Sequence, residues 1–209
     1  DIVYLLFNKE LPNEEQSVAI RQDLSNRAAV PGDLESVLKN LPKSGHPMDW
    51  LSVGIHTLGM METTNNWKDD ALNLIARMPR LMGLIFRIRE GREENIPSDD
   101  TSISMVERFI QCLDLPNADS EKMKRIISTY LVLHMDHGGG NLSTFTGKAI
   151  ASSKATVYSA MAGAMNALSG PLHGRANQSC LEFVLKVGTS DPAEVEAFEP
   201  AELAANPPN

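Results

Sequence analysis

Hydrophobic residues recur along most of this chain every three or four positions, which is the period of an amphipathic helix and not the alternation typical of a strand. The first such stretch follows Asn13, a residue favoured at helix N-caps, and predicts a helix over 13–29. The same spacing predicts further helices over 34–41, 46–63, 67–91, 102–113, 118–135, 142–152, 156–169, 174–187 and 193–205.

Prolines separate several of these segments and indicate short connections between helices. Pro31, Pro42 and Pro116 each lie between two predicted helices, whereas Pro79 lies inside the long segment 67–91 and predicts a kink there. No segment has the pattern of a strand. We therefore expect an all-α fold, with helices packed ridge into groove and several antiparallel neighbours.

Composition sets the size and chemistry of the core. The chain has 209 residues, of which 42% are hydrophobic, so it is long enough for one sizeable core. Aromatic residues make up only 5%, whereas ten residues are methionine, so we expect a core of aliphatic side chains and methionine. Gly54 and Gly59 lie on one predicted helix and permit another helix to approach closely.

The charge balance and the cysteines exclude several classes of function. A formal net charge of −8 and the absence of a basic cluster argue against nucleic acid, and an anion site must rely on local donors. Cys112 and Cys180 are far apart, which disfavours a disulfide framework and a thiolate zinc site; we expect both to be reduced and buried. No apolar run is long enough to span a bilayer and no basic leader is present, so we expect a soluble intracellular protein without membrane contact.

The segment 134–141 is the first candidate site. It holds three consecutive glycines, which expose backbone N–H groups, and His137 and Asn141 can reach the same space. His134 and Asp136 are two positions apart and face different sides of a helix, which disfavours a metal site. For His134 and His137 a buried, helix-capping histidine stays an alternative.

The segment 169–178 is the second candidate site, because a predicted turn delivers His173 to the start of a helix. A helix N-terminus disfavours the imidazolium, so we expect His173 to be neutral at pH 7 and to donate a hydrogen bond to a developing oxyanion. Arg175 lies where it can meet an anion, although an exposed, solvated arginine is equally compatible with the sequence.

These segments resemble citrate synthase. The resemblance covers most of residues 1–187, and the matching motifs occur in the same order and spacing. No single motif excludes a chance match, but all of them together do. The matching pieces are Leu-Phe-Asn-Lys-Glu-Leu-Pro near the start, His46-Pro-Met, His134-x-Asp-His137-x-Gly-Gly-Asn141-x-Ser-Thr-Phe-Thr, and Gly170-Pro-Leu-His173-Gly174-x-Ala-Asn.

The resemblance implies a two-domain, all-helical homodimer that condenses acetyl-CoA with oxaloacetate, releasing citrate and coenzyme A in the tricarboxylic acid cycle. Residues 1–187 would form a citrate-synthase-like multi-helical bundle, an incomplete large domain. Residues 188–209 would begin the small-domain region or form a linker. The cytoplasm, or the mitochondrial matrix in a eukaryote, is the implied location.

The resemblance also implies roles for individual residues. His173 corresponds to the catalytic histidine that hydrogen-bonds the thioester carbonyl of acetyl-CoA. His137 corresponds to the histidine that holds oxaloacetate and polarises its ketone, with Asn141 supporting that site. Gly174 corresponds to a glycine whose backbone lies against the coenzyme. No metal and no bound cofactor are implied, and acetyl-CoA is a co-substrate.

Two departures from the family pattern affect what we expect of this chain. Gly138 stands where the family normally has an acid, which leaves the surroundings of His137 less negative. The family's catalytic aspartate, its second catalytic histidine and its later substrate-binding arginines have no counterpart in residues 1–209. The apolar start and Pro-Pro-Asn end look cut, so we expect an incomplete chain that is inactive alone.

Two alternatives stay open. A 2-methylcitrate synthase, which uses propionyl-CoA, shares these motifs, and one methylene is worth only about 1–3 kcal/mol in a pocket. A non-catalytic helical module that keeps a dimer core is the alternative from another class. The small residues of segment 157–168 suit a dimer contact, but they suit packing within one chain equally well.

Overall fold

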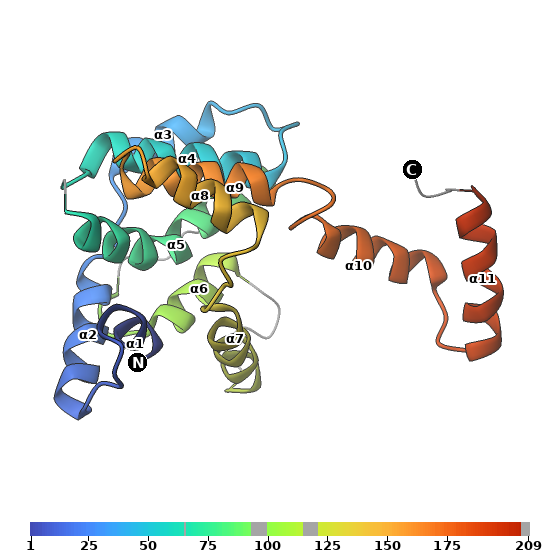
Figure 1. The fold of residues 1–209 in the computed structure, drawn as a ribbon, viewed down its shortest axis with the longest axis horizontal. Helices are drawn as coiled ribbons and strands as arrows, with labels where there is room; N and C mark the ends of the chain where they lie inside the picture. Colours follow the sequence, from blue (N-terminus) through green and yellow to red (C-terminus); the bar gives the residue numbers. More distant parts are fainter. Residues whose placement is uncertain (65, 93–99, 115–120, 206–209) are drawn as a thin grey trace. The chain divides into compact units, whose positions relative to one another are not determined.

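The structure is a computed structural model, and it describes residues 1–64, 66–92, 100–114 and 121–205, with the side chains of 199–205 excepted. In these ranges the regular structure consists of eleven α-helices, without a strand, so the all-α prediction is confirmed. The helices are α1 Ile2–Asn8, α2 Glu14–Asn26, α3 Gly32–Lys39, α4 Pro47–Glu62, α5 Trp67–Glu90, α6 Met105–Leu113, α7 Glu121–His134, α8 Leu142–Ala151, α9 Val157–Leu168, α10 Ala176–Val187 and α11 Pro192–Ala205 (Figure 1).

Ten of the eleven helices in the described ranges were predicted, with boundaries shifted by up to three residues, whereas α1 was not predicted. Asn13 caps α2 as expected, and it forms a capping box with Gln16. The helix ends at Asn26, three residues before the predicted end and ahead of Pro31. The predicted start of α7, residues 118–120, lies outside the described residues. Helix α5 runs through Pro79 without a break in its assignment, and the kink at Pro79 stays a prediction.

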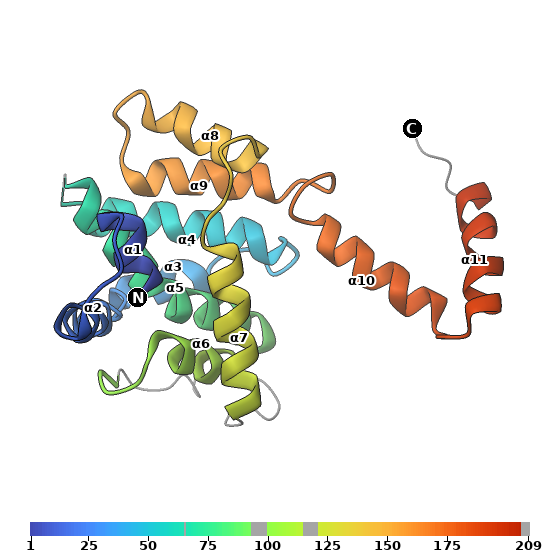
Figure 2. The same ribbon diagram turned by 60° about the horizontal axis from the view of Figure 1, so that its bottom comes forward.

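The chain divides into two compact units, residues 1–167 and 168–209. The first unit holds the core. Helix α9 packs on α4, α4 on α5, and α5 on α6, as Figure 2 shows. Fully buried side chains of this core include Trp50, Leu58, Leu81, Leu84 and Tyr158. The predicted domain division after residue 187 differs from this contact-based one and stays a prediction.

Glycines bring these helices close together, as expected for Gly54 and Gly59. A Cβ on Gly54 would lie 2.7 Å from a methyl carbon of Leu81, and one on Gly59 would lie 2.5 Å from Cβ of Tyr158. Since real Cβ atoms almost never approach so closely, the contacts of α4 with α5 and with α9 depend on these glycines. Ala160, Ala162 and Ala164 of α9 are buried within the first unit, which supports the interpretation of intrachain packing for this helix.

A partly buried polar cluster joins α4, α5 and α9. The Tyr158 hydroxyl donates to Oε1 of Glu62 at 2.7 Å, and Arg77 forms an ion pair with the same oxygen at 2.5 Å. Burial and the neighbouring Glu62 carboxylate raise the pKa of Tyr158 above its usual value, so the phenol keeps its proton. The cluster therefore links the N-terminal half of α9 to the C-terminus of α4.

The second unit contains the turn after α9, helix α10 and helix α11. Phe183 of α10 and Phe198 of α11 make an edge-to-face contact with ring centroids 5.8 Å apart. Helix α10 has no buried residue, and its Cys180 is exposed, so the prediction that both cysteines are buried is correct for Cys112 and wrong for Cys180. Leu181, Val184 and Leu185 of α10 are exposed as well.

Candidate active site

The loop with three consecutive glycines, residues 138–140, connects α7 to α8. Helix α7 ends at His134, and α8 begins after Asn141, whose extended backbone makes it the N-cap. The Asn141 side chain does not cap the helix; its amide instead donates to the carbonyl of Gly138 at 3.3 Å. Asn141 therefore holds the loop in a closed turn that ends at the start of α8.

The two histidines of this segment have different environments. The His134 ring lies back on its own helix, with Nδ1 2.7 Å from the carbonyl oxygen of Tyr130 and the ring stacked on the Tyr130 ring at 4.1 Å. His137 lies beyond the helix in the loop. Both are exposed, so the alternative of a buried capping histidine is wrong for each, and His137 is accessible to a ligand.

The backbone of the glycine loop is also accessible. A Cβ on Gly138 or Gly140 would meet nothing within 4 Å, whereas one on Gly139 would lie 2.7 Å from Nζ of Lys148 on α8. The ammonium of Lys148 thus lies against the loop that carries His137. A local cation of this kind is what an anion site needs in a chain of net charge −8.

His173 lies in the turn between α9 and α10, where it is partly exposed. Helix α10 begins at Ala176 and its N-cap is Arg175, so His173 precedes the N-cap by two residues and does not lie in the first helical turn. The His173 N–H donates to Gly170 at 3.0 Å, and its carbonyl accepts from the Ala176 N–H at 3.1 Å. The neutral state of its ring stays a prediction.

The predicted residues therefore fall in two places. His137 and Asn141 lie in one loop of the first unit, and His173 and Gly174 are neighbours in a turn of the second unit. The two histidines lie in different units, and the expectation that their imidazoles face one cavity stays a prediction. No group of three His, Cys, Asp or Glu side chains in the described ranges is placed to hold a metal ion.

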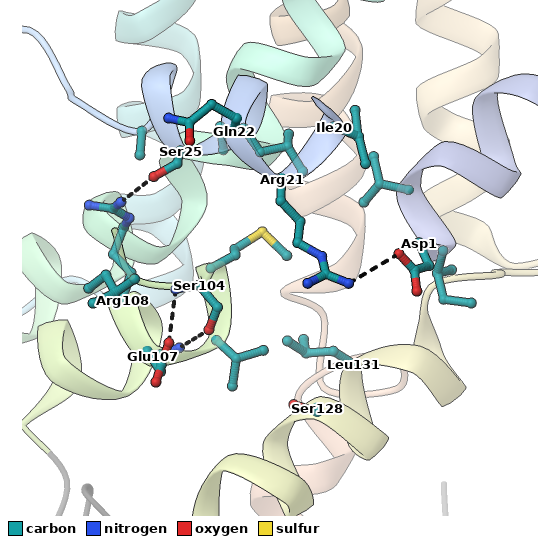
Figure 3. A pocket seen from close by; sticks show the side chains of 18 of the residues that line it. Asp1, Ile20, Arg21, Gln22, Ser25, Ser104, Glu107, Arg108, Ser128 and Leu131 are labelled. Atoms are coloured by element: carbon teal, nitrogen blue, oxygen red, sulfur yellow. Dashed lines mark hydrogen bonds and ion pairs between the residues drawn. The ribbon is translucent and has the colours of Figure 1, made fainter. Parts of the chain in front are cut away.

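A pocket of about 800 Å³ lies elsewhere in the first unit, among α1, α2, α6 and α7. Several of its polar side chains pair with one another, as Figure 3 shows for Arg21 with Asp1 and for Arg108 with Ser25. None of the predicted site residues lines it. Sequence reasoning did not find this pocket, because its walls come from segments more than 100 residues apart, which no local motif connects.

Comparisons with known proteins agree with this architecture. The family model described as citrate synthase, C-terminal domain, matches residues 1–206. Citrate synthase 4, mitochondrial, from Arabidopsis thaliana is 34% identical over 200 residues, covering 89% of this chain and 41% of that protein. The 2-methylcitrate synthase, mitochondrial, of Yarrowia lipolytica is 28% identical over 200 residues, covering 89% of this chain and 43% of that protein.

A solved structure shows the same fold. The crystal structure of citrate synthase from Thermotoga maritima MSB8 matches with a TM-score of 0.81 at 23% identity, over 100% of this chain and 54% of that one. The helical bundle, with its loop and turn, therefore has the all-helical fold of that structure. The chain belongs to the citrate synthase family. It spans about two-fifths of the length of the curated relatives it matches.

The comparisons confirm the resemblance and the fold class inferred from the sequence. In addition, none of the helices within the described part of the chain combines the length and the apolar character needed to cross a membrane.

Proposed function

We propose that this chain supplies part of the active site of a citrate synthase, which condenses acetyl-CoA with oxaloacetate to give citrate and coenzyme A. The proposal rests on two accessible histidine segments in a member of this family. The His137 loop is held by the hydrogen bond from the Asn141 side-chain amide to Gly138, and the His173 turn is held by backbone hydrogen bonds. We propose His173 and His137 as catalytic residues, with His137, Asn141 and Gly174 as substrate-binding residues.

In this proposal the His173 ring donates a hydrogen bond to the thioester carbonyl oxygen of acetyl-CoA. A base removes a proton from the methyl carbon, and the negative charge that develops on the oxygen is stabilised by the donor. The methyl carbon, now nucleophilic, forms a bond to the ketone carbon of oxaloacetate, and the ketone oxygen takes up a proton. Hydrolysis of the thioester then releases citrate and coenzyme A.

Oxaloacetate carries two carboxylates, so its binding needs local positive charge and N–H donors. His137 and the open backbone of Gly138 and Gly140 can supply donors, and the Lys148 ammonium lies beside them. Because Gly138 replaces an acid of the family pattern, no carboxylate at that position opposes the substrate. These features support the assignment of the α7–α8 loop to oxaloacetate.

The test is His173→Ala in the full-length gene product. We expect kcat to fall by roughly 10²–10³, the loss typical for one oxyanion donor, with a smaller change in the affinity for oxaloacetate. His56→Ala, at an exposed position of α4, is the matched control and is expected to keep the wild-type rate. A rate near that of the wild type for His173→Ala would refute the role of this residue.

A 2-methylcitrate synthase is the second candidate, because one relative of that name covers the same residues. The two activities differ in the acyl group accepted, and kcat/KM for acetyl-CoA against propionyl-CoA in the full-length protein separates them. A non-catalytic module is the third candidate. In that case oxaloacetate would produce no upward shift in the thermal unfolding midpoint, whereas a retained site binds and stabilises the folded chain.

We also propose that the protein is a homodimer and that α7 and α8 contribute to its contact surface. Ile126, Tyr130 and Leu133 recur on one side of α7 and are exposed, as are Leu142 and Phe145 of α8. An exposed apolar surface of this kind is typical of a protein–protein contact. For location we propose the mitochondrial matrix over the cytoplasm, since citrate synthase 4 of Arabidopsis thaliana and the 2-methylcitrate synthase of Yarrowia lipolytica are both named mitochondrial.

A further inference from the structure

The turn that carries His173 is built on the last carbonyl of α9. The Gly174 N–H donates to the carbonyl oxygen of Leu168 at 2.9 Å, which closes the turn. Inside it, both backbone groups of His173 are engaged, the N–H with Gly170 and the carbonyl with Ala176. The position of the His173 side chain therefore depends on how the turn is fastened at Gly174.

Gly174 has no room for a side chain. A Cβ at this position would lie 2.5 Å from the carbonyl oxygen of Leu168, and 2.6 and 2.7 Å from Cγ and Cδ1 of the same residue. The oxygen is the one that accepts the Gly174 N–H, so an added methyl group would collide with the acceptor of the hydrogen bond that closes the turn. A carbonyl at the end of a helix moves only together with its backbone.

The requirement for glycine at residue 174 is one of space and not of backbone conformation. Among the described glycines only Gly91 and Gly188 have a positive φ, so alanine can adopt the backbone angles of residue 174. The substitution Gly174→Ala therefore adds one methyl group and changes little else. This makes it a specific probe of the contact with Leu168.

We propose that Gly174 is a positioning residue for the His173 imidazole. Because Gly174 has no side chain, the turn can pack against the end of α9, and this packing determines the position of the ring. The inference rests on the proposed function. It assigns Gly174 a role beyond lying against the coenzyme. A misplacement of about 1 Å in a catalytic group can cost on the order of 10²-fold in rate, so a small shift of the turn has a large effect.

The test compares Gly174→Ala with the wild type in the full-length gene product. We expect kcat at saturating acetyl-CoA to fall by at least about tenfold, while the dissociation constant for oxaloacetate changes by less than about threefold. Hydrogen exchange of the peptide covering residues 169–176 should become faster, because the bond from Gly174 to Leu168 is weakened. Gly32→Ala is the matched control, since a Cβ there would meet nothing within 4 Å.

The outcomes separate this role from the others. A higher KM for acetyl-CoA with an unchanged kcat would mean that the methyl group only obstructs the coenzyme, and it would overturn the proposal. Unchanged hydrogen exchange at 169–176 would overturn it as well. If the wild type had no condensing activity, the proposed function would fail, while the exchange measurement would still report whether Gly174 fastens the turn.

Discussion

The substitution Tyr158→Phe removes one hydroxyl from the cluster that joins α4, α5 and α9. That hydroxyl belongs to a side chain that is 0% exposed, and its bond to Oε1 of Glu62 is 2.7 Å long. A hydrogen bond to a charged partner contributes about 1.5–3 kcal/mol. Because Arg77 still pairs with the same oxygen in the variant, we expect a loss at the lower end, about 1.5–2 kcal/mol of the free energy of unfolding.

The remaining atoms of the cluster cannot replace the lost hydrogen bond. Oε2 of Glu62 is buried and has no hydrogen-bond partner among the described residues, so the carboxylate already has fewer partners than it could accept. The phenylalanine ring fills nearly the same volume, and therefore the cavity contribution is small. The effect should come almost wholly from the lost hydrogen bond.

Urea denaturation at equal protein concentration measures this free energy. The control is Tyr4→Phe, the same chemical change at a partly exposed position of α1, where we expect less than about 0.5 kcal/mol. The slope of the free energy against urea should be equal in the three proteins if only stability changes. A loss for Tyr158→Phe no larger than that for Tyr4→Phe would refute the reasoning.

Two further predictions concern acid stability and assembly. Hydrogen bonds with Ser104 and Lys124 lower the pKa of Glu107 to about 2, so its ionised form stabilises the fold above about pH 4.5 and this contribution is lost as the pH falls toward 2. The deficit of Glu107→Gln in unfolding free energy should therefore be larger at about pH 7 than at about pH 3, and an equal deficit would contradict this. Leu133→Lys should shift the protein toward monomer in sedimentation velocity, whereas Leu11→Lys, at a similarly exposed leucine, should not; equal behaviour of the two would exclude α7 from the dimer contact.

Local patterns in the sequence predicted ten of the eleven helices that the structure describes, all but α1, and the segments proposed to carry the chemistry. Helical periodicity, the Asn13 cap and the breaks near prolines act within a few residues, so they predicted most helices to within about two or three residues of their ends. The glycine loop at His137 and the turn at His173 could also be predicted from the sequence, because each is a run of adjacent residues. The family pattern added their roles as expectations.

The residues that meet across the chain became known only from the folded structure. Tyr158 and Glu62 are 96 positions apart, and nothing near either one indicates the other. The packing role of the alanines of α9, the exposure of Cys180 and the contact of Gly174 with Leu168 likewise depend on where whole helices and turns come to lie. Capping and periodicity are set by neighbouring residues, whereas burial and close contact are properties of the packed chain, which is why the first could be predicted and the second had to be observed.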